Sequence, residues 1–249
     1  MPDALPIGST IGIIGGGQLG RMLSVAASRL GYRCHIFEPG AEPPAGQVAH
    51  SVTTATYDDT DALRAFGESV DVITYEFENI PTAALDVLQD TAPIYPGREA
   101  LRISQDRLTE KAFLQGLGLK TAPFADVTDV ASLDTAIGNI GTPSILKTRR
   151  FGYDGKGQAR IMSSADAAAA LSDMQGASAI LEGFVDFSHE VSVIAARGLD
   201  GAVAAFDPGE NVHADGILRT TTVPANLSAS QKSDAVLIAA QILNALDYV

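Results

Sequence analysis

Residues 11–20 read IGIIGGGQLG, and this stretch indicates how the first part of the chain folds. A short run of apolar, β-branched residues breaks into three glycines, and a helical pattern follows them. Gly31 ends that pattern, as glycine does at many helix ends. The apolar stripe of the predicted helix consists of Leu19, Met22, Leu23, Ala26, Ala27 and Leu30. A strand that passes through glycines into a helix is typical of a parallel sheet with crossover helices.

The same alternation continues through the first hundred residues. Further strands are predicted at 34–37 and 71–77, with helices at 58–66 and from Pro81 onward. Proline suits the start of a helix because its fixed φ is already helical. Strands that alternate with helices pack as a parallel sheet covered on both faces. The sequence therefore predicts an α/β, Rossmann-like, doubly wound domain over residues 1–100.

After residues 93–97 (PIYPG) the pattern changes. Ser104 is expected to cap a helix that the pair Gly116 and Gly118 ends. The further elements predicted are a helix at 129–140, strands at 145–147 and 158–162 around a glycine-rich loop, an alanine-rich helix after 163–164, strands at 180–185 and 190–196, and a last helix that runs to Val249. This is an α+β pattern. We expect a second domain at 101–249, with a small lid at about 121–186 and the start of a larger subdomain at 187–249.

Composition excludes several classes of function. The chain has 30 acidic and 17 basic residues, a formal net charge of −13, so it repels nucleic-acid backbones and anionic lipid. The single cysteine, Cys34, allows no disulfide within the chain, which fits a reducing compartment. No apolar stretch reaches the ~18 residues of a membrane span, and the N-terminus lacks the features of a secretory signal. We expect a cytoplasmic enzyme that acts on small molecules.

Two glycine-rich loops are candidate binding sites. Gly15, Gly17 and Gly20 match G-x-G-x-x-G between a strand and a helix, and Glu38 ends the next strand, as in a dinucleotide-binding fingerprint. The alternative is a tight turn that needs glycine for packing alone. At the tip of this loop, Gln18 is either a ligand donor or a polar first residue of the helix.

The second loop is more specific. Lys147 ends an apolar strand, and residues 151–158 (FGYDGKGQ) follow within four positions. Backbone amides of such a flap fold over a polyphosphate, while a lysine on a rigid strand supplies a positive charge. The spacing is not that of the P-loop. The alternative is a plain hairpin turn, which does not require Tyr153, Asp154 and Lys156 together.

Other polar residues are weaker candidates on their own. Glu182 and the three residues after it resemble a hinge whose backbone pairs with an adenine edge, and Glu190 begins the next strand. Ordinary solvated acids are the alternative for both glutamates. Arg107 has a surface helix position as its alternative, and His213 lies in a predicted polar turn at 210–216. No His or Cys pair has zinc spacing.

These motifs together resemble the ATP-grasp superfamily and, within it, the 5-(carboxyamino)imidazole ribonucleotide synthases. The resemblance rests on GGGQLGRM (15–22), YEFENIP (75–81), Lys147 with GYDGKGQ (152–158), EGFV (182–185), HEVSV (189–193) and ENVHADGILR (210–219). It implies a pre-ATP-grasp domain followed by an ATP-grasp domain. It also implies ATP-dependent carboxylation of 5-aminoimidazole ribonucleotide with bicarbonate, through carboxyphosphate, in purine biosynthesis.

The resemblance assigns residues by position. It implies ATP contacts at Arg107, Lys147, Gly152, Tyr153, Asp154, Gly155, Lys156, Gly157, Gln158, Glu182, Gly183, Phe184, Val185, Glu190 and His213. It implies ribonucleotide contacts at Gln18, Leu19, Glu76, Tyr153, Asp154 and Lys156. The catalytic group on this interpretation is Lys147, Tyr153, Asp154 and Lys156.

The sequence departs from the family pattern at Phe151, where many members have a second glycine before Gly152. The family's magnesium ligands have no match within residues 1–249. Since the last helix also stops in apolar material, we expect a longer native sequence that carries the Mg²⁺ ligands beyond Val249. A homodimer through the N-terminal domain is expected by analogy.

Three alternatives remain open on sequence alone. One is formate-dependent glycinamide ribonucleotide transformylase, a relative that shares the N-terminal domain. Another is an NAD-dependent oxidoreductase, which the first glycine loop and Glu38 favour but which leaves the second loop unexplained. A nucleotide sensor without catalysis is the third.

Overall fold

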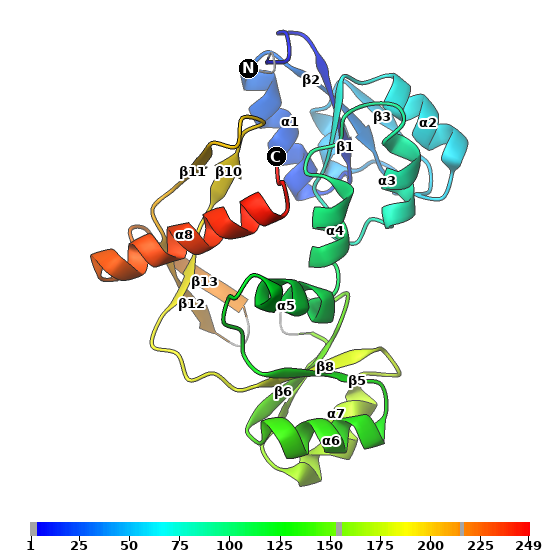
Figure 1. Cartoon of the computed structure of the whole chain (residues 1–249). Coiled ribbons are helices and arrows are strands. Elements are labelled where there is room, and N and C mark those ends of the chain that lie inside the picture. The colour runs from blue at the N-terminus through cyan, green and yellow to red at the C-terminus, as the bar shows by residue number, and fades with distance from the viewer. Residues whose placement is uncertain (1–3, 153–155, 215–216) are drawn as a thin grey trace. The chain divides into compact units, whose positions relative to one another are not determined.

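The computed structural model describes residues 4–152, 156–214 and 217–249, and it divides into two compact units. The first comprises residues 1–102 with 198–200 and 246–249, and the second comprises 103–197 and 201–245. The predicted positions Tyr153, Asp154 and Gly155 lie outside the described residues. Figure 1 labels the elements of both units. None of the described helices is both long and apolar enough to cross a membrane.

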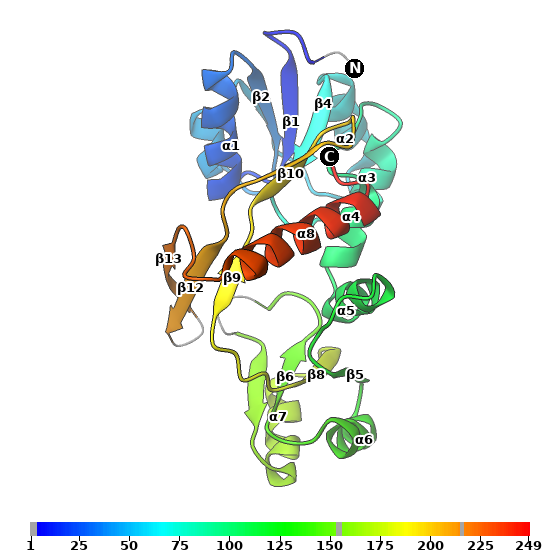
Figure 2. The same cartoon turned by 60° about the vertical axis from the view of Figure 1, so that its left-hand side comes forward.

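The first unit is built on a parallel sheet in the order β3-β2-β1-β4, as predicted. The strands are β1 (Thr10–Ile14), β2 (Arg33–Phe37), β3 (Ser51–Thr53) and β4 (Val72–Tyr75). The helical segments are α1 (Gln18–Arg29), η1 (Pro44–Gln47), α2 (Thr60–Glu68), α3 (Thr82–Leu88) and α4 (Arg98–Ser104). Figure 2 shows β1 between β2 and β4.

Successive residues of β1 place the two halves of the core on opposite faces of the sheet. Ile13 packs with Ala27 of α1 on one face, whereas Ile14 packs with Phe66 of α2 and Leu85 of α3 on the other. All five side chains are almost fully buried. The period of two along a strand produces this division. The carboxyl ends of the parallel strands lie at one edge of the sheet, and this edge carries the glycine turn. Gly15 follows β1 there, and Glu76 follows β4.

Helix α1 forms where the sequence predicts it but buries a different face. Its buried residues are Gly20, Ser24 and Ala27, whereas Met22 and Leu30 are 59% and 68% exposed. A Cβ on Gly20 would lie 2.8 Å from the carbonyl oxygen of Gly15. Close approach of the helix to the turn therefore selects small residues on the buried face, and of the predicted apolar stripe only Ala27 is buried.

The second unit contains an antiparallel sheet in the order β5-β8-β6-β7. Its strands are β5 (Phe124–Val127), β6 (Ser144–Thr148), β7 (Gln158–Ile161) and β8 (Ala179–Gly183). Helices α6 (Val130–Ile140) and α7 (Ala167–Asp173), with the short η2 (Ser164–Asp166) before α7, accompany this sheet. Leu133, Leu146 and Leu181 are central to its core. Helix α5 (Arg107–Gly116) precedes the sheet in the chain.

Three predictions about the second unit were wrong in detail. Asp106, not Ser104, caps α5, because its carboxylate accepts hydrogen bonds from the amides of Leu108 and Thr109. The predicted strand at 190–196 is two strands with different partners, β9 (Glu190–Ser192) and β10 (Ala195–Arg197). The predicted turn at 210–216 is mostly strand, since β12 (Gly209–Ala214) pairs with β13 (Ile217–Thr222).

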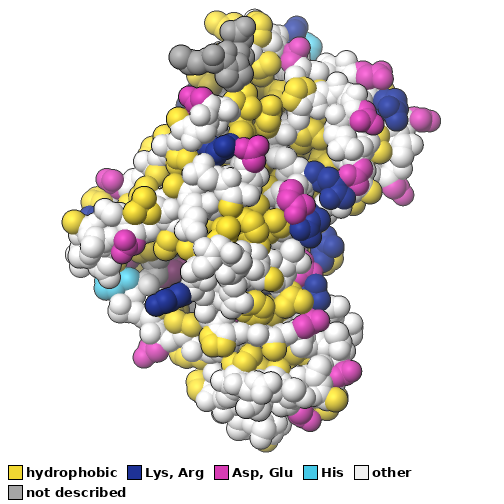
Figure 3. All heavy atoms as spheres, in the orientation of Figure 1, with side chains coloured by type: hydrophobic (Ala, Val, Ile, Leu, Met, Phe, Trp, Pro, Cys, Tyr) yellow, Lys and Arg dark blue, Asp and Glu magenta, His cyan; other side chains and the backbone are white. Residues whose placement is uncertain are grey.

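The remaining elements complete the second unit. Strand β11 (Val203–Ala205) pairs with β10, and β9, β12 and β13 form a separate three-stranded sheet. The last helix is α8 (Ala229–Ala245), which ends before the predicted Val249. On the face shown in Figure 3, basic side chains lie beside acidic ones. Two ion pairs of the first unit join Arg98 to Asp86 and Arg102 to Glu99.

Candidate functional site

The first glycine loop is closed by two carboxylates. The amide of Gly16 donates to Glu38 Oε2, and the amide of Gly17 donates to Glu76 Oε1. Both donor–acceptor distances are 2.8 Å. Gly15 has φ +99°, and a Cβ there would lie 2.9 Å from Glu76 Cγ. Glycine at this position is therefore required both by the backbone conformation and by the closeness of Glu76.

This arrangement argues against a dinucleotide phosphate at the loop. A dinucleotide phosphate at the start of α1 would use amides of the turn, and the amides of Gly16 and Gly17 already donate to carboxylates. Glu38, which the fingerprint would assign to a ribose hydroxyl, also accepts from the amide of Gly40 at 3.0 Å. The match to G-x-G-x-x-G thus reflects a turn that acids close.

Electrostatics around this turn are unusual. Burial raises the pKa of Glu76, and the charge of Glu38 adds to that rise, while the amide of Gly17 opposes it. Burial and the same two carboxylates also raise the pKa of Tyr57. Gln18 and Leu19 are the first residues of α1 and are exposed directly after Gly17. The structure therefore brings the predicted substrate residues Gln18, Leu19 and Glu76 together.

In the second unit, Lys147 lies beside Glu182. Strands β6 and β8 pair so that Ile145 is opposite Glu182, which puts Lys147 on the same face as Glu182, away from the core. Lys147 Nζ lies 2.9 Å from Glu182 Oε2, and Lys111 Nζ of α5 lies 3.4 Å from the same oxygen. One carboxylate thus holds two ammonium groups.

Glu182 is nearly inaccessible, with 8% of its side chain exposed. Within the described part of the chain, its Oε1 has no hydrogen-bond partner. A buried carboxylate oxygen without a partner is costly, because it has lost water and gained nothing in exchange. The free oxygen is consistent with a site that a ligand completes.

Sequence reasoning missed Lys111. The signal was present, because Arg107 and Lys111 are four residues apart and therefore on one face of a helix. Glu110, between them, is also part of the cluster. Burial raises the pKa of Glu110, the charges of Arg107 and Lys111 lower it, and Glu182 raises it.

The ends of the second glycine loop are fixed on Thr148. The amide of Thr148 donates to the carbonyl of Gly157 at 2.8 Å. Gly157 has φ +68°, and a Cβ there would lie 2.6 Å from Thr148 Oγ1. A Cβ on Gly152 would lie 3.7 Å from an Arg107 Nη2, so Arg107 is beside the start of the loop. Phe151 has φ +62°, a left-handed backbone conformation that glycine adopts more readily than phenylalanine.

The remaining predicted residues also belong to the second unit. Lys156 is exposed, and Gln158 begins β7 opposite Lys147. Gly183 ends β8, and Phe184 and Val185 after it are about half exposed. Glu190 and His213, from the paired strands β9 and β12, face each other, with 3.1 Å between Glu190 Oε1 and His213 Nδ1.

The described residues contain no cluster of three or more His, Cys, Asp or Glu side chains that could hold a metal ion.

Comparison with known proteins agrees with this arrangement. Residues 8–105 match the ribonucleotide synthetase preATP-grasp domain, and residues 112–249 match the ATP-grasp domain. The chain is 54% identical over 248 residues to an N5-carboxyaminoimidazole ribonucleotide synthase of Brucella melitensis, covering 99% of this chain and 68% of that protein.

Solved structures give the same result. The ADP complex of an N5-carboxyaminoimidazole ribonucleotide synthetase superposes with a TM-score of 0.95 at 39% identity, covering 100% of this chain and 66% of that one. The enzyme of Aspergillus clavatus, in complex with ADP and 5-aminoimidazole ribonucleotide, gives a TM-score of 0.88 at 27% identity, with 96% and 63% coverage.

The chain thus spans about two thirds of the length of these relatives. One family is indicated by both domain matches. The 54% identity to the Brucella melitensis protein, of which this chain covers 68%, indicates the same family. The chain belongs to the ATP-grasp family and, within it, to the N5-carboxyaminoimidazole ribonucleotide synthases.

Proposed function

We propose that this protein carboxylates the exocyclic amine of 5-aminoimidazole ribonucleotide with bicarbonate while ATP is cleaved to ADP and phosphate. The observation that supports this most is the pair of Lys147 and Glu182 at the base of the glycine-rich loop anchored on Thr148. A cation on a rigid strand next to backbone amides is suited to a polyphosphate. The first glycine turn, closed by acids, is not.

The nucleotide site consists of residues in the second unit. We assign ATP contacts to Arg107, Lys147, the loop 152–158, the segment 182–185, Glu190 and His213. Lys147 moves from Glu182 Oε2 to phosphate oxygens, and Glu182 then keeps Lys111 as its counter-ion. Positive charge at the transferring γ-phosphoryl group is what such a transfer needs, because its transition state is stabilised mainly by positioning and electrostatics.

Bicarbonate is a poor electrophile, and phosphorylation activates it as carboxyphosphate. This intermediate is short-lived in water, so exclusion of water is part of the protein's task. We assign that task to the loop 152–158, and the catalytic roles of Lys156, Tyr153 and Asp154 remain predictions of this proposal. The ribonucleotide is assigned to Gln18, Leu19 and Glu76, which the first unit holds together.

The described residues do not fit a magnesium site by themselves, since no acidic cluster is present among them. We further propose a cytoplasmic homodimer formed through the N-terminal domain, with domains at 1–100 and 101–249. The exposed Met22 and Leu30 of α1 support that dimer surface.

The test is phosphate release from ATP, with bicarbonate and 5-aminoimidazole ribonucleotide each present or omitted. Release that requires both supports the proposal. ATP hydrolysis indifferent to both contradicts it. Replacing the ribonucleotide and bicarbonate by glycinamide ribonucleotide and formate distinguishes the transformylase, and sedimentation velocity measures the dimer.

A further inference from the structure

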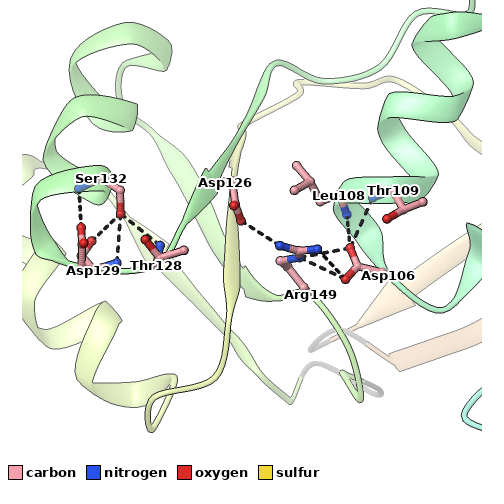
Figure 4. A network of polar contacts seen from close by, with 8 residues as sticks. All are labelled: Asp106, Leu108, Thr109, Asp126, Thr128, Asp129, Ser132 and Arg149. Carbon is pink, nitrogen blue, oxygen red and sulfur yellow. Dashed lines mark hydrogen bonds and ion pairs between the residues drawn. The ribbon is translucent and has the colours of Figure 1, made fainter. Parts of the chain in front are cut away.

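Arg149 connects three elements of the second unit through one guanidinium group. Its Nε lies 3.1 Å from both carboxylate oxygens of Asp106, and its Nη2 lies 2.7 Å from Asp106 Oδ2. Its Nη1 donates to Asp126 Oδ1 of β5 at 3.1 Å. Figure 4 shows Arg149 between the two aspartates. A planar guanidinium that binds a carboxylate through two nitrogens fixes direction as well as distance.

Asp106 has a second task in this network. Its Oδ1 accepts the amides of Leu108 and Thr109, at 3.0 and 3.3 Å, and so caps α5. Burial raises the pKa of Asp106, but the hydrogen bonds from Arg149 and the two amides hold it below its usual value. The carboxylate is thus charged at neutral pH. It interacts both with the first amides of α5 and with the guanidinium group of Arg149.

The backbone and a neighbouring pair repeat the connection. The amide of Arg107 donates to the carbonyl of Arg149 at 3.0 Å. Arg150 donates from Nη2 to the side-chain oxygen of the buried Gln105 at 2.9 Å. Residues 105–107 are therefore each bound to residues 149–150, across more than forty positions of sequence.

The location of this network gives it a consequence for the site. Arg149 is two residues after Lys147 and three residues before Gly152, and α5, whose cap Asp106 it binds, begins with Arg107. We propose that Asp106 and Arg149 are positioning residues for the nucleotide, because they fix Arg107 and Lys147 relative to the start of the glycine-rich loop. This inference rests on the proposed function of that loop.

A purely structural role is the competing explanation, and α6 offers a matched control. Asp129 caps α6 by accepting the amide of Ser132 at 2.8 Å, in a capping box, and Figure 4 shows it apart from Arg149. Asp129→Asn makes the same chemical change at a cap that, within the described part of the chain, forms no ion pair with an arginine. Both variants keep a side-chain oxygen that can accept from the helix.

The experiment compares Asp106→Asn, Arg149→Lys and Asp129→Asn by calorimetric titration with ATP and by steady-state kinetics. We expect Asp106→Asn to raise the Kd and the KM for ATP about tenfold, with the KM for the ribonucleotide changed less than about twofold. Arg149→Lys keeps the charge but loses the two-nitrogen geometry, so a smaller rise of the same kind is expected. Asp129→Asn leaves the Kd for ATP unchanged.

Two results overturn the inference. One is an unchanged Kd for ATP in a folded Asp106→Asn protein. The other is an equal rise in Asp129→Asn, which would mean that loss of any helix cap has the same effect. If instead the unaltered protein binds no ATP, the proposed function fails, and that result is separate from both. Circular dichroism spectra of the variants establish that each is folded.

Discussion

The shared carboxylate of Glu182 leads to a prediction about stability. At an effective dielectric constant of about 20, a unit charge attracts its opposite by about 6 kcal/mol at the 2.9 Å of Lys147 and by about 5 kcal/mol at the 3.4 Å of Lys111. Loss of hydration opposes much of both attractions. Either lysine alone therefore neutralises most of the charge on Glu182.

The prediction is tested by the free energies of unfolding in a double-mutant cycle of Lys111→Met and Lys147→Met. Each single variant is expected to lower the free energy of unfolding by about 1 kcal/mol, since the other lysine remains. The double variant leaves a carboxylate that is 8% exposed without a cation, which costs about 3–5 kcal/mol. The coupling between the two changes is then at least about 1 kcal/mol, with the double variant worse than the sum.

Urea unfolding followed by far-ultraviolet circular dichroism measures these free energies, because the chain has no tryptophan for fluorescence. Lys120→Met, at an exposed lysine of the same unit, is the control and is expected to stay within about 0.5 kcal/mol of the parent. Strictly additive single variants would refute the idea that the two lysines share one counter-ion.

Three further predictions concern the first unit. Gly15→Ala is expected to destabilise the protein by about 2 kcal/mol or more, because the backbone has φ +99° and the new Cβ meets Glu76. Gly97→Ala, with open space around the new Cβ, is the control. Equal urea midpoints for the two variants would contradict the expected loss of stability in Gly15→Ala. The pKa of Glu76 is raised in the folded protein, so above the ordinary glutamate pKa the folded state binds more protons than the unfolded chain, and the free energy of unfolding falls as pH rises. Glu76→Gln should flatten this slope when unfolding curves are recorded at several pH values between about 4.5 and 7. A slope unchanged by the substitution would count against this prediction. Cys34 is 4% exposed, and burial raises the pKa of its thiol. A disulfide reagent should therefore react with Cys34 only as urea unfolds the protein. Rapid labelling without urea would contradict the buried position.

Much of the architecture could be predicted from local sequence. The strand that ends at Ile14 and the helix that begins at Gln18 follow from apolar spacing and the glycines between them. Lys147 at the end of a strand, followed by a glycine-rich loop, indicated the second site for the same reason. Periodicity and turn residues act over a few positions, so they are visible in a single sequence.

The rest depends on contacts between distant residues. Lys147 and Glu182 are 35 positions apart, and nothing local indicates that they pair. Arg149 reaches Asp106 across 43 positions, and Glu38 reaches Gly16 across 22. The apolar stripe of α1 does not mark its buried face, apart from Ala27, because close packing on Gly15 favours Gly20 over larger apolar neighbours. Such effects appear only when the sheet register is known.

We propose that ATP binds at β6 and β8 of the second unit and not at the first glycine turn. Amide hydrogen exchange followed by mass spectrometry, with and without ATP, tests it directly. Slower exchange is expected in peptides that cover 144–152 and 179–185, with exchange in residues 11–20 unchanged. Protection of residues 11–20 alone, with the β6 and β8 peptides unaffected, would contradict it.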